Sequence, residues 1–383
     1  YFRIFLAVFI ISGAVSFINP YAGHFLFHKS ILPFEAVTEK ISVKSGIEDK
    51  GPPVKYRHSS EVINGNKQEI DILEIDPGSR NVEVKPALSF DSVFGFENLS
   101  SIASKNKAFA AVNAGFFSEY GHPAGMVMID GRVIVSPTGR YPVFIMNNGH
   151  AGLQELGGRM WISGEGGKIF FDEVNSIEGP GKTVLYTREF GSDNRAKTGN
   201  TTLEIVEGRI KGMVQNAGST PIPENGILLT FYEPYGIDIG SLPFKAGDAV
   251  DTNYEFKADK RMQAYECGSW LVRDGRIVIG DRDEWVGVMT NWDPRTAVGI
   301  KDDGTVILLT VDGRQPGYSV GLTGNELAEL LLRYGAENAA MLDGGASTEM
   351  IVEGKIVNRP SFKGQERPLG GGIIIRLRDK NDD

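Results

Sequence analysis

Short apolar segments joined by pairs of an acidic residue and glycine recur along most of the chain, and this pattern limits the fold more than any other feature. Each pair is flanked by Val, Ile or Leu, as a two-residue hairpin turn requires. The pairs are Asp130-Gly131, Glu207-Gly208, Asp274-Gly275, Asp303-Gly304 and Glu353-Gly354. Their separations are irregular, whereas a solenoid or propeller needs a fixed period. The sequence therefore predicts a β-rich domain folded by many hairpins.

Helical patterns are few. Thr323 to Glu326 forms a capping-box pattern, three leucines follow at helical spacing, and Gly335 suits the left-handed position after the last turn. Ser100 to Lys107 is a second candidate helix. We therefore expect an α+β domain, a β-rich mixed sheet domain with one or two packed helices.

The first residues differ from the rest. Residues 4–18 are almost wholly apolar, and with residues 19–27 the stretch is long enough to cross a bilayer. No small-residue cleavage pattern follows it, so an uncleaved anchor helix is favoured over a removed signal peptide. We expect a transmembrane anchor or signal segment over 1–27, a linker over 28–60 and the folded domain over 61–379. The domain would then be exported, and either membrane-anchored on the extracytoplasmic face or secreted.

Composition excludes several classes of protein. The net charge of -9 argues against a nucleic-acid partner, because such binding needs many Lys and Arg contacts to phosphate. A single cysteine, Cys267, excludes an internal disulfide framework. The stretch from Gly317 to Gly321 matches the Gly-x-Ser-x-Gly elbow of α/β-hydrolases, but all five histidines precede its serine, which is the wrong order for that triad.

Two apolar runs end on Asp-Gly and suggest a site. Val306 to Val311 leads into Asp312, and a second run leads into Asp343, followed by Gly344-Gly345. With one helix between them, the two strands could lie side by side as a parallel crossover pair and bring both carboxylates to one sheet edge. The alternative is that each Asp only accepts hydrogen bonds from turn amides.

Three further residues stand in similar places. Arg295 follows Pro294 at a strand entrance, where its planar fork could hold a phosphate; a surface pair with an Asp is the alternative. Asn113 closes an apolar strand, so its buried amide needs partners, either backbone groups or a ligand. His122 follows closely and could equally be a lone exposed loop histidine.

Several blocks, in the right order, resemble the phosphodiester glycosidase family over roughly residues 108–377. These blocks are Asn113 to Phe117, Pro294 to Gly299, Asp312 to Arg314, Leu342 to Ser347, and Arg367-Pro368. The chain departs from the family pattern at Ala114 and Ala346, which replace glycines, and at Glu266-Cys267-Gly268, where relatives tend to be glycine-rich. These departures bear on the substrate more than on the reaction class.

The resemblance implies hydrolysis of a sugar-1-phosphodiester, of the N-acetylglucosamine-1-phosphate type. The departing phosphate monoester needs cationic and amide donors, and the sugar centre needs a carboxylate. Asp343 is the expected carboxylate, with Asp312 and Glu266 as candidates for a second. The expected substrate-binding residues are Asn113, His122, Arg295, Arg314, Gly344, Gly345, Ser347, Thr348 and Arg367.

Three hypotheses follow. The first is an exported hydrolase that needs no cofactor and acts on a glycan or sugar-phosphate polymer of the cell envelope or an extracellular polysaccharide. The second is a binding module of the same fold that has lost catalysis, suggested by the altered Glu266-Cys267 block. The third is a metal-dependent phosphoesterase with Asp312 and Asp343 as ligands of a divalent ion.

Overall fold

The computed structural model describes residues 52–177, 181–216, 218–233 and 242–378. The predicted anchor over residues 1–27 lies outside the described residues. No helix in the described part of the chain is both long and apolar enough to cross a membrane. The folded domain begins at β1 (Val54–Ile63), which pairs along its whole length with β2 (Asn66–Ile75). Residues 54–60, expected to belong to a linker, are therefore strand; most of the β1 residues are exposed, so the strand has no apolar period.

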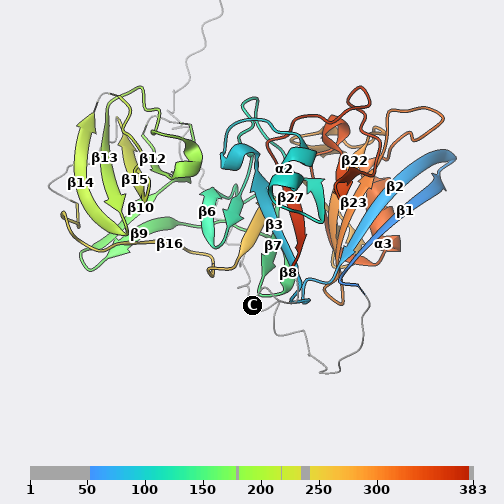
Figure 1. Ribbon diagram of the computed structural model, residues 1–383, viewed down its shortest axis with the longest axis horizontal. Coiled ribbons are helices and arrows are strands. Elements are labelled where there is room, and N and C mark those ends of the chain that lie inside the picture. Colours follow the sequence, from blue (N-terminus) through green and yellow to red (C-terminus); the bar gives the residue numbers. More distant parts are fainter. Residues whose placement is uncertain (1–51, 178–180, 217, 234–241, 379–383) are drawn as a thin grey trace, which may run out of the picture. The chain divides into compact units, whose positions relative to one another are not determined.

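A seven-stranded sheet carries most of the predicted site. One of its faces packs against α3 (Gly324–Arg333), which contacts β18 and β24, and the opposite face contributes to the largest apolar cluster. Figure 1 shows the β1–β2 hairpin in blue beside β22 and β23. The order is β1, β2, β23 (Val306–Val311), β22 (Arg295–Lys301), β24 (Ala336–Met341), β18 (Trp270–Arg273) and β19 (Arg276–Ile277).

The predicted neighbours β23 and β24 are not adjacent. β22 lies between them and pairs antiparallel with both, so β23 and β24 run parallel but one strand apart. Both strands still end at the same sheet edge, as expected. Since β22 runs the opposite way, it starts at that edge, and its first residue, Arg295, stands between Asp312 and Asp343.

A second sheet has five strands and packs against α2 (Leu99–Lys105), close to the helix predicted over 100–107. Its order is β26 (Lys355–Ile356), β25 (Met350–Val352), β4 (Ala110–Asn113), β27 (Gly371–Leu377) and β3 (Val82–Leu88). A third sheet has the order β6 (Arg132–Val135), β5 (Val127–Ile129), β17 (Gln263–Glu266), β7 (Pro142–Asn147) and β8 (His150–Glu155).

Three more sheets complete the described fold. The first has the order β11 (Glu173–Val174), β12 (Thr183–Tyr186), β15 (Gly226–Tyr232), β13 (Asn200–Val206) and β14 (Arg209–Asn216). The other two are β10 (Gly167–Phe171), β9 (Met160–Gly164) and β16 (Asp251–Tyr254), and the pair β20 (Arg282–Asp283) and β21 (Gly287–Val288). Short 3-10 turns are η1 (Ser89–Asp91), η2 (Arg188–Phe190) and η4 (Gly345–Ser347).

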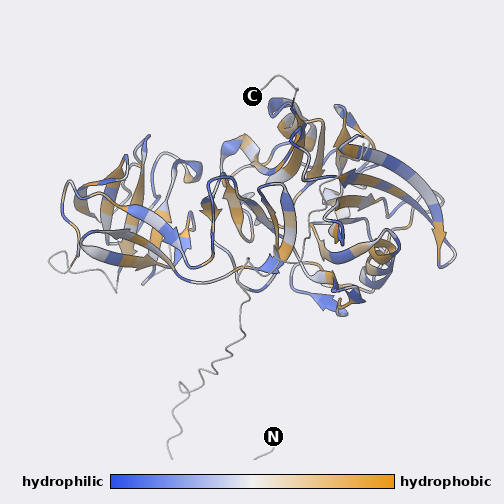
Figure 2. Cartoon of the chain, turned by 90° about the horizontal axis from the view of Figure 1, so that it is seen from below, coloured by the Kyte–Doolittle hydropathy of each residue, from blue (hydrophilic) through white to orange (hydrophobic). Residues whose placement is uncertain are grey.

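The local predictions are confirmed where turn or capping chemistry determines the structure. All five acid-glycine pairs lie in loops between antiparallel neighbours, and at four of them both residues have positive φ, as at Asp130 (50°) and Gly131 (72°). The capping box of Thr323 and Glu326 forms at the start of α3. The fold is therefore β-rich with mixed sheets and two α-helices in the described ranges. Figure 2 shows the apolar residues concentrated on the strands and the exposed outer strand β1 as largely hydrophilic.

Candidate active site

Asn113 joins the ends of two sheets at Asp343. Its Nδ2 donates to the Asp343 carbonyl (2.6 Å), and its Oδ1 accepts from the Thr296 hydroxyl (2.8 Å) and the Glu349 amide (3.1 Å). The Asp343 amide in turn donates to the Ala114 carbonyl (3.0 Å). The buried amide of Asn113 is thus bonded to protein groups, and it fixes the backbone on both sides of the Asp343 side chain.

Asp343 is a half-buried residue at this junction. It accepts hydrogen bonds from the Ser347 hydroxyl and the Gly344 amide, and Arg367 Nη1 donates to Ser347 Oγ (2.8 Å). Burial raises the pKa of Asp343 to about 6, while the Ser347 hydrogen bond and the Arg367 charge act in the opposite direction. The carboxylate also raises the pKa of buried Tyr265, to which burial contributes most. Such a group changes its charge near neutral pH, as an acid-base catalyst must.

The two glycines after Asp343 allow three chain segments to meet. A Cβ on Gly344 would lie 2.9 Å from the Pro294 carbonyl, and one on Gly345 would lie 3.1 Å from Arg314 Nη2. Gly345 has a φ of 60°, and its amide donates to the Pro294 carbonyl (2.8 Å). Both glycine amides are therefore used inside the protein, and their absent side chains give Arg314 its place against the turn.

Arg314 and Arg367 provide positive charge next to the Asp343 turn. Arg314 Nε donates to Asp293 (2.8 Å), and half of the Arg314 side chain is exposed. Arg367 lies over the Phe117 ring at 5.3 Å and reaches Ser347. Each guanidinium group has more N–H donors than these contacts use. Such planar, multiply donating groups bind phosphate oxygens well.

Arg295 starts beside Asp343 but its side chain follows another path. Since Ala297 pairs with Met341, the same register brings Arg295 next to Asp343 at the sheet edge. Its guanidinium is buried, and it donates to the carbonyls of Leu322 (2.8 Å) and Asn291 (2.9 Å). Burial lowers the pKa of Arg295, and the charge of Arg314 adds to this. Arg295 thus holds the segments before β22 and α3 in place.

Asp312 lies on the far side of β22 and is bonded on both oxygens. It accepts from Asn358 Nδ2 (3.0 Å), the Arg359 amide (2.8 Å) and the Tyr318 hydroxyl (3.2 Å). Burial raises the pKa of Asp312 to about 6, against these hydrogen bonds. The structure does not bring Asp312 into the group around Asp343.

Glu266 and His122 are likewise engaged elsewhere. Buried Glu266 accepts from the amides of Met126 (2.7 Å) and Thr138 (3.0 Å) and from the Thr138 hydroxyl. Burial raises its pKa, which these hydrogen bonds partly oppose. The ring nitrogens of His122 lie 2.8 Å from the Pro123 carbonyl and 2.7 Å from the Asn175 carbonyl. Both side chains connect loops. Neither belongs to the group formed by Asp343, Ser347, Arg314 and Arg367.

The structure also reveals a carboxyl pair that the sequence did not predict, in which Glu349 is buried and Glu366 is half-buried. Glu349 is 1% exposed, its Oε1 has no partner among the described residues, and its carboxyl faces Glu366. Burial, followed by the neighbouring Glu366, raises the pKa of Glu349 to about 9. Glu366 accepts from the Ser100 amide (2.8 Å) and hydroxyl (2.7 Å). The signal in the sequence was a single acid directly before the apolar run Met350–Val352.

Thr348 completes the polar layer under the site. It is buried, its hydroxyl lies 3.3 Å from that of Thr296, and its carbonyl accepts from Asn358 Nδ2 (3.1 Å). Asn358 therefore links the Asp343 turn to Asp312. In the part of the chain that the structure describes, no group of three or more His, Cys, Asp or Glu side chains could hold a metal ion.

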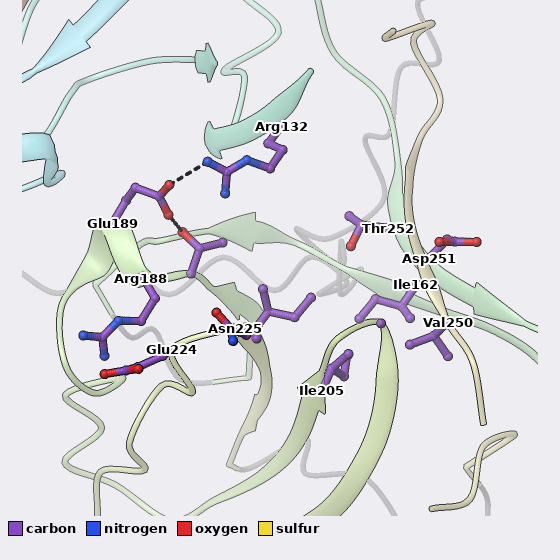
Figure 3. Close-up of a pocket in the computed structure, with 14 residues that line it drawn as sticks. Arg132, Ile162, Arg188, Glu189, Ile205, Glu224, Asn225, Val250, Asp251 and Thr252 are labelled. Atoms are coloured by element: carbon purple, nitrogen blue, oxygen red, sulfur yellow. Dashed lines mark hydrogen bonds and ion pairs between the residues drawn. The ribbon is translucent and has the colours of Figure 1, made fainter. Parts of the chain in front are cut away.

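A separate cavity of about 440 Å³ shares no lining residue with the Asp343 group. Figure 3 shows the ion pair of Arg132 and Glu189 on one side of it, with Ile205 and Val250 among the apolar residues that line it. Its rim carries charges of both signs, and nothing in its geometry links it to the chemistry of Asp343.

Comparison with known proteins confirms the predicted family resemblance. Residues 200–376 match the model of the phosphodiester glycosidase family. A SPbeta prophage-derived uncharacterized protein, YomE, of Bacillus subtilis is 31% identical over 169 residues, which are 42% of this chain and 26% of that protein. The N-acetylglucosamine-1-phosphodiester alpha-N-acetylglucosaminidase of Bos taurus is 30% identical over 185 residues, 44% of this chain and 31% of the bovine protein. The chain thus spans about a quarter to a third of the length of these relatives.

The fold has a solved counterpart. A hypothetical protein from Synechocystis superposes with a TM-score of 0.69 at 22% identity, covering 86% of this chain and 64% of the other. At this identity the likeness establishes the fold alone. The family match includes Arg295, Arg314, Asp343 and Arg367, whereas the block from Asn113 to Phe117 precedes it.

Proposed function

Residues 200–376 match the phosphodiester glycosidase family, and from that premise we propose that the chain hydrolyses glycosyl-1-phosphodiester bonds. One observation carries the proposal. Asp343, half-buried and with a pKa raised to about 6, has two arginines near it, because Arg367 reaches it through Ser347 and Arg314 packs on the turn that follows it. A carboxylate beside two guanidinium groups suits a bond between an anomeric carbon and a phosphate.

The reaction needs little from a general acid. The leaving group is a phosphate monoester, whose second pKa of about 6 makes it a far better leaving group than a sugar alkoxide. Water attacks the anomeric carbon, the bond from that carbon to the phosphate oxygen breaks, and the phosphate keeps the electron pair. Ionised Asp343 accepts a proton from the attacking water and stabilises positive charge on the sugar. Arg314 and Arg367 bind the departing phosphate.

The substrate we propose is of the N-acetylglucosamine-1-phosphate type, within a polymer of the cell envelope or an extracellular polysaccharide. The bovine relative, whose name specifies that bond, supports the sugar. The apolar stretch over residues 4–18 supports export and attachment to a membrane, which would give the site access to such polymers.

The test is release of sugar by the purified full chain from a panel of glycosyl-1-phosphodiesters. We expect free N-acetylglucosamine and a phosphate monoester, with release slowed about a thousand-fold in Asp343→Asn. Absence of release across the panel, with protein shown to be folded by its cooperative melting, would exclude the hydrolase. Binding of the same compounds without turnover would instead support a glycan-binding module.

A further inference from the structure

Two aromatic rings lie stacked and partly exposed near the end of β24. The centroids of Phe116 and Trp285 are 5.8 Å apart, and the rings are tilted by only 12°. Trp285 is 40% exposed, and Tyr141 lies at its edge with centroids 6.4 Å apart. A large flat apolar surface open to solvent is a common basis for ligand binding.

The stack is close to Asp343. Phe116 comes two residues after Ala114, whose carbonyl accepts from the Asp343 amide (3.0 Å). The Phe116 ring covers Gly268, where an added Cβ would lie 2.7 Å from Phe116 Cε2. The Gly268 amide donates to the Met341 carbonyl (2.7 Å), which places the ring at the start of β18, next to β24.

Trp285 is held in position although it is exposed. The buried carboxylate of Asp283 accepts from the amides of Trp285 (2.7 Å) and Val286 (2.8 Å), and from the Ser269 amide (3.2 Å) and hydroxyl. One acid therefore fixes the turn that carries Trp285 to the segment beside Met341. Trp285 is therefore presented to solvent in a fixed position.

The order of strands puts the stack and Arg314 on opposite sides of Asp343. The order is β23, β22, β24, β18. Arg314 follows β23, whereas Phe116 covers the start of β18. If the phosphate binds Arg314, the sugar on the other side of the broken bond lies towards β18.

We propose that Phe116 and Trp285 form the platform for the sugar ring whose anomeric carbon reacts. This rests on the proposed function, because the reacting bond defines the two sides. The C–H face of a pyranose packs on the aromatic surface, while its hydroxyl groups reach the polar rim. That rim is formed by Tyr141, whose hydroxyl donates to Glu284 (2.6 Å), and Arg140, which pairs with Glu284 (3.1 Å).

The test compares Trp285→Ala with Trp285→Phe, which keeps an aromatic ring, and with Phe170→Ala, a change at an exposed aromatic of β10. Hydrolysis of an N-acetylglucosaminyl-1-phosphodiester and binding of free N-acetylglucosamine by saturation-transfer NMR are measured on the full chain. In Trp285→Ala we expect KM to rise roughly 10-fold with kcat little changed, and sugar binding to be lost. Trp285→Phe should stay within about three-fold, and Phe170→Ala should match the wild type.

Turnover and sugar binding that are both unchanged in Trp285→Ala would overturn the platform and leave the proposed function intact. Equal losses in Trp285→Ala and Trp285→Phe, with both variants folded, would also overturn it, because stacking would then not be the cause. If the wild type bound the sugar, Trp285→Ala did not, and no phosphodiester was hydrolysed, the platform would be supported and the proposed hydrolase activity would be excluded. A wild type with neither binding nor turnover would exclude both.

Discussion

Asp312 and Asp343 close two parallel strands at one edge of the same sheet, each before a glycine, yet their surroundings differ. Asp312 is 2% exposed, and protein donors occupy both of its oxygens. Asp343 is partly exposed and accepts from Ser347 and the Gly344 amide, with Arg367 close by. Burial raises both pKa values to about 6, so the pKa does not distinguish them. A position at a strand end makes a carboxylate a candidate catalytic group. Whether it can bind a substrate depends on how many of its lone pairs already accept hydrogen bonds from the protein.

The largest expected effect is on turnover in Asp343→Asn. Loss of the charge should lower kcat about a thousand-fold, because the sugar centre and the attacking water lose their carboxylate. The pKa of Asp343 is raised in the folded state, so its ionised form destabilises the fold above the unfolded pKa. The neutral amide should therefore leave the free energy of unfolding at pH 7 unchanged or higher, as measured by denaturant titration.

The pH profile provides the control for this variant. The wild-type rate should rise with pH through about 6, as Asp343 loses its proton. Asp312 titrates in the same range, so Asp312→Asn must keep this rise if the comparison is correct. If Asp312→Asn lost the rise of the rate with pH while Asp343→Asn kept its kcat, Asp312 would be the catalytic carboxylate and Asp343 the structural one.

The second effect is on stability in Asp312→Ala. The change removes an acceptor from Asn358 Nδ2, which is buried, and from the Arg359 amide and the Tyr318 hydroxyl, whose bonds are partly buried. We expect the free energy of unfolding to fall by about 3 kcal/mol, since each unpaired donor costs about 1 to 3 kcal/mol and the loop can partly relax. The rate per folded molecule should stay within a few-fold of the wild type. A large loss of kcat at temperatures where the variant is folded would contradict the structural role.

Much of the fold could be predicted because its signals are local. β23 has the predicted bounds, and the α3 capping box and acid-glycine turns depend on residues within a few positions of one another. The order of strands in the sheet depends on contacts between distant residues and was not predicted: β22 lies between β23 and β24. β1 was missed because an exposed edge strand has no apolar alternation.

The site was harder to predict for the same reason. Glu266 looked like a second carboxylate, but its donors come from Met126 and Thr138, 140 and 128 residues away. Asp312 is bonded by Asn358, 46 residues away. A sequence shows which acids stand at strand ends, whereas the donors that occupy them come from loops whose positions only the folded chain determines.

The third effect compares an arginine near Asp343 with an arginine near Asp312, by the change in kcat/KM that each substitution causes. In Arg367→Lys the charge remains but the planar fork to Ser347 and the phosphate is lost, so kcat/KM should fall about 10- to 100-fold. Arg359→Lys is the matched control on the Asp312 side, where the exposed guanidinium lies over Tyr318 at 5.1 Å. That variant should stay within about two-fold. Equal losses in both would mean that the phosphate does not lie at the Asp343 end.

The smallest effect concerns Glu349, the buried acid beneath the Asp343 end. Its pKa is raised from the ordinary 4.5 to about 9, so between these values the folded state holds a proton that the unfolded chain has lost. The free energy of unfolding should therefore decrease as pH rises from about 4.5 to 9. Glu349→Gln removes this titration, and we expect a gain of about 1 kcal/mol at pH 7 and a flatter pH dependence.

Glu165→Gln is the control for this change, because Glu165 is exposed and its substitution should leave the pH dependence of unfolding unchanged. Denaturant titrations at several pH values measure both variants. If Glu349→Gln kept the wild-type slope, the Glu349 carboxyl would be ionised in the fold, and its burial beside Glu366 would not determine its charge.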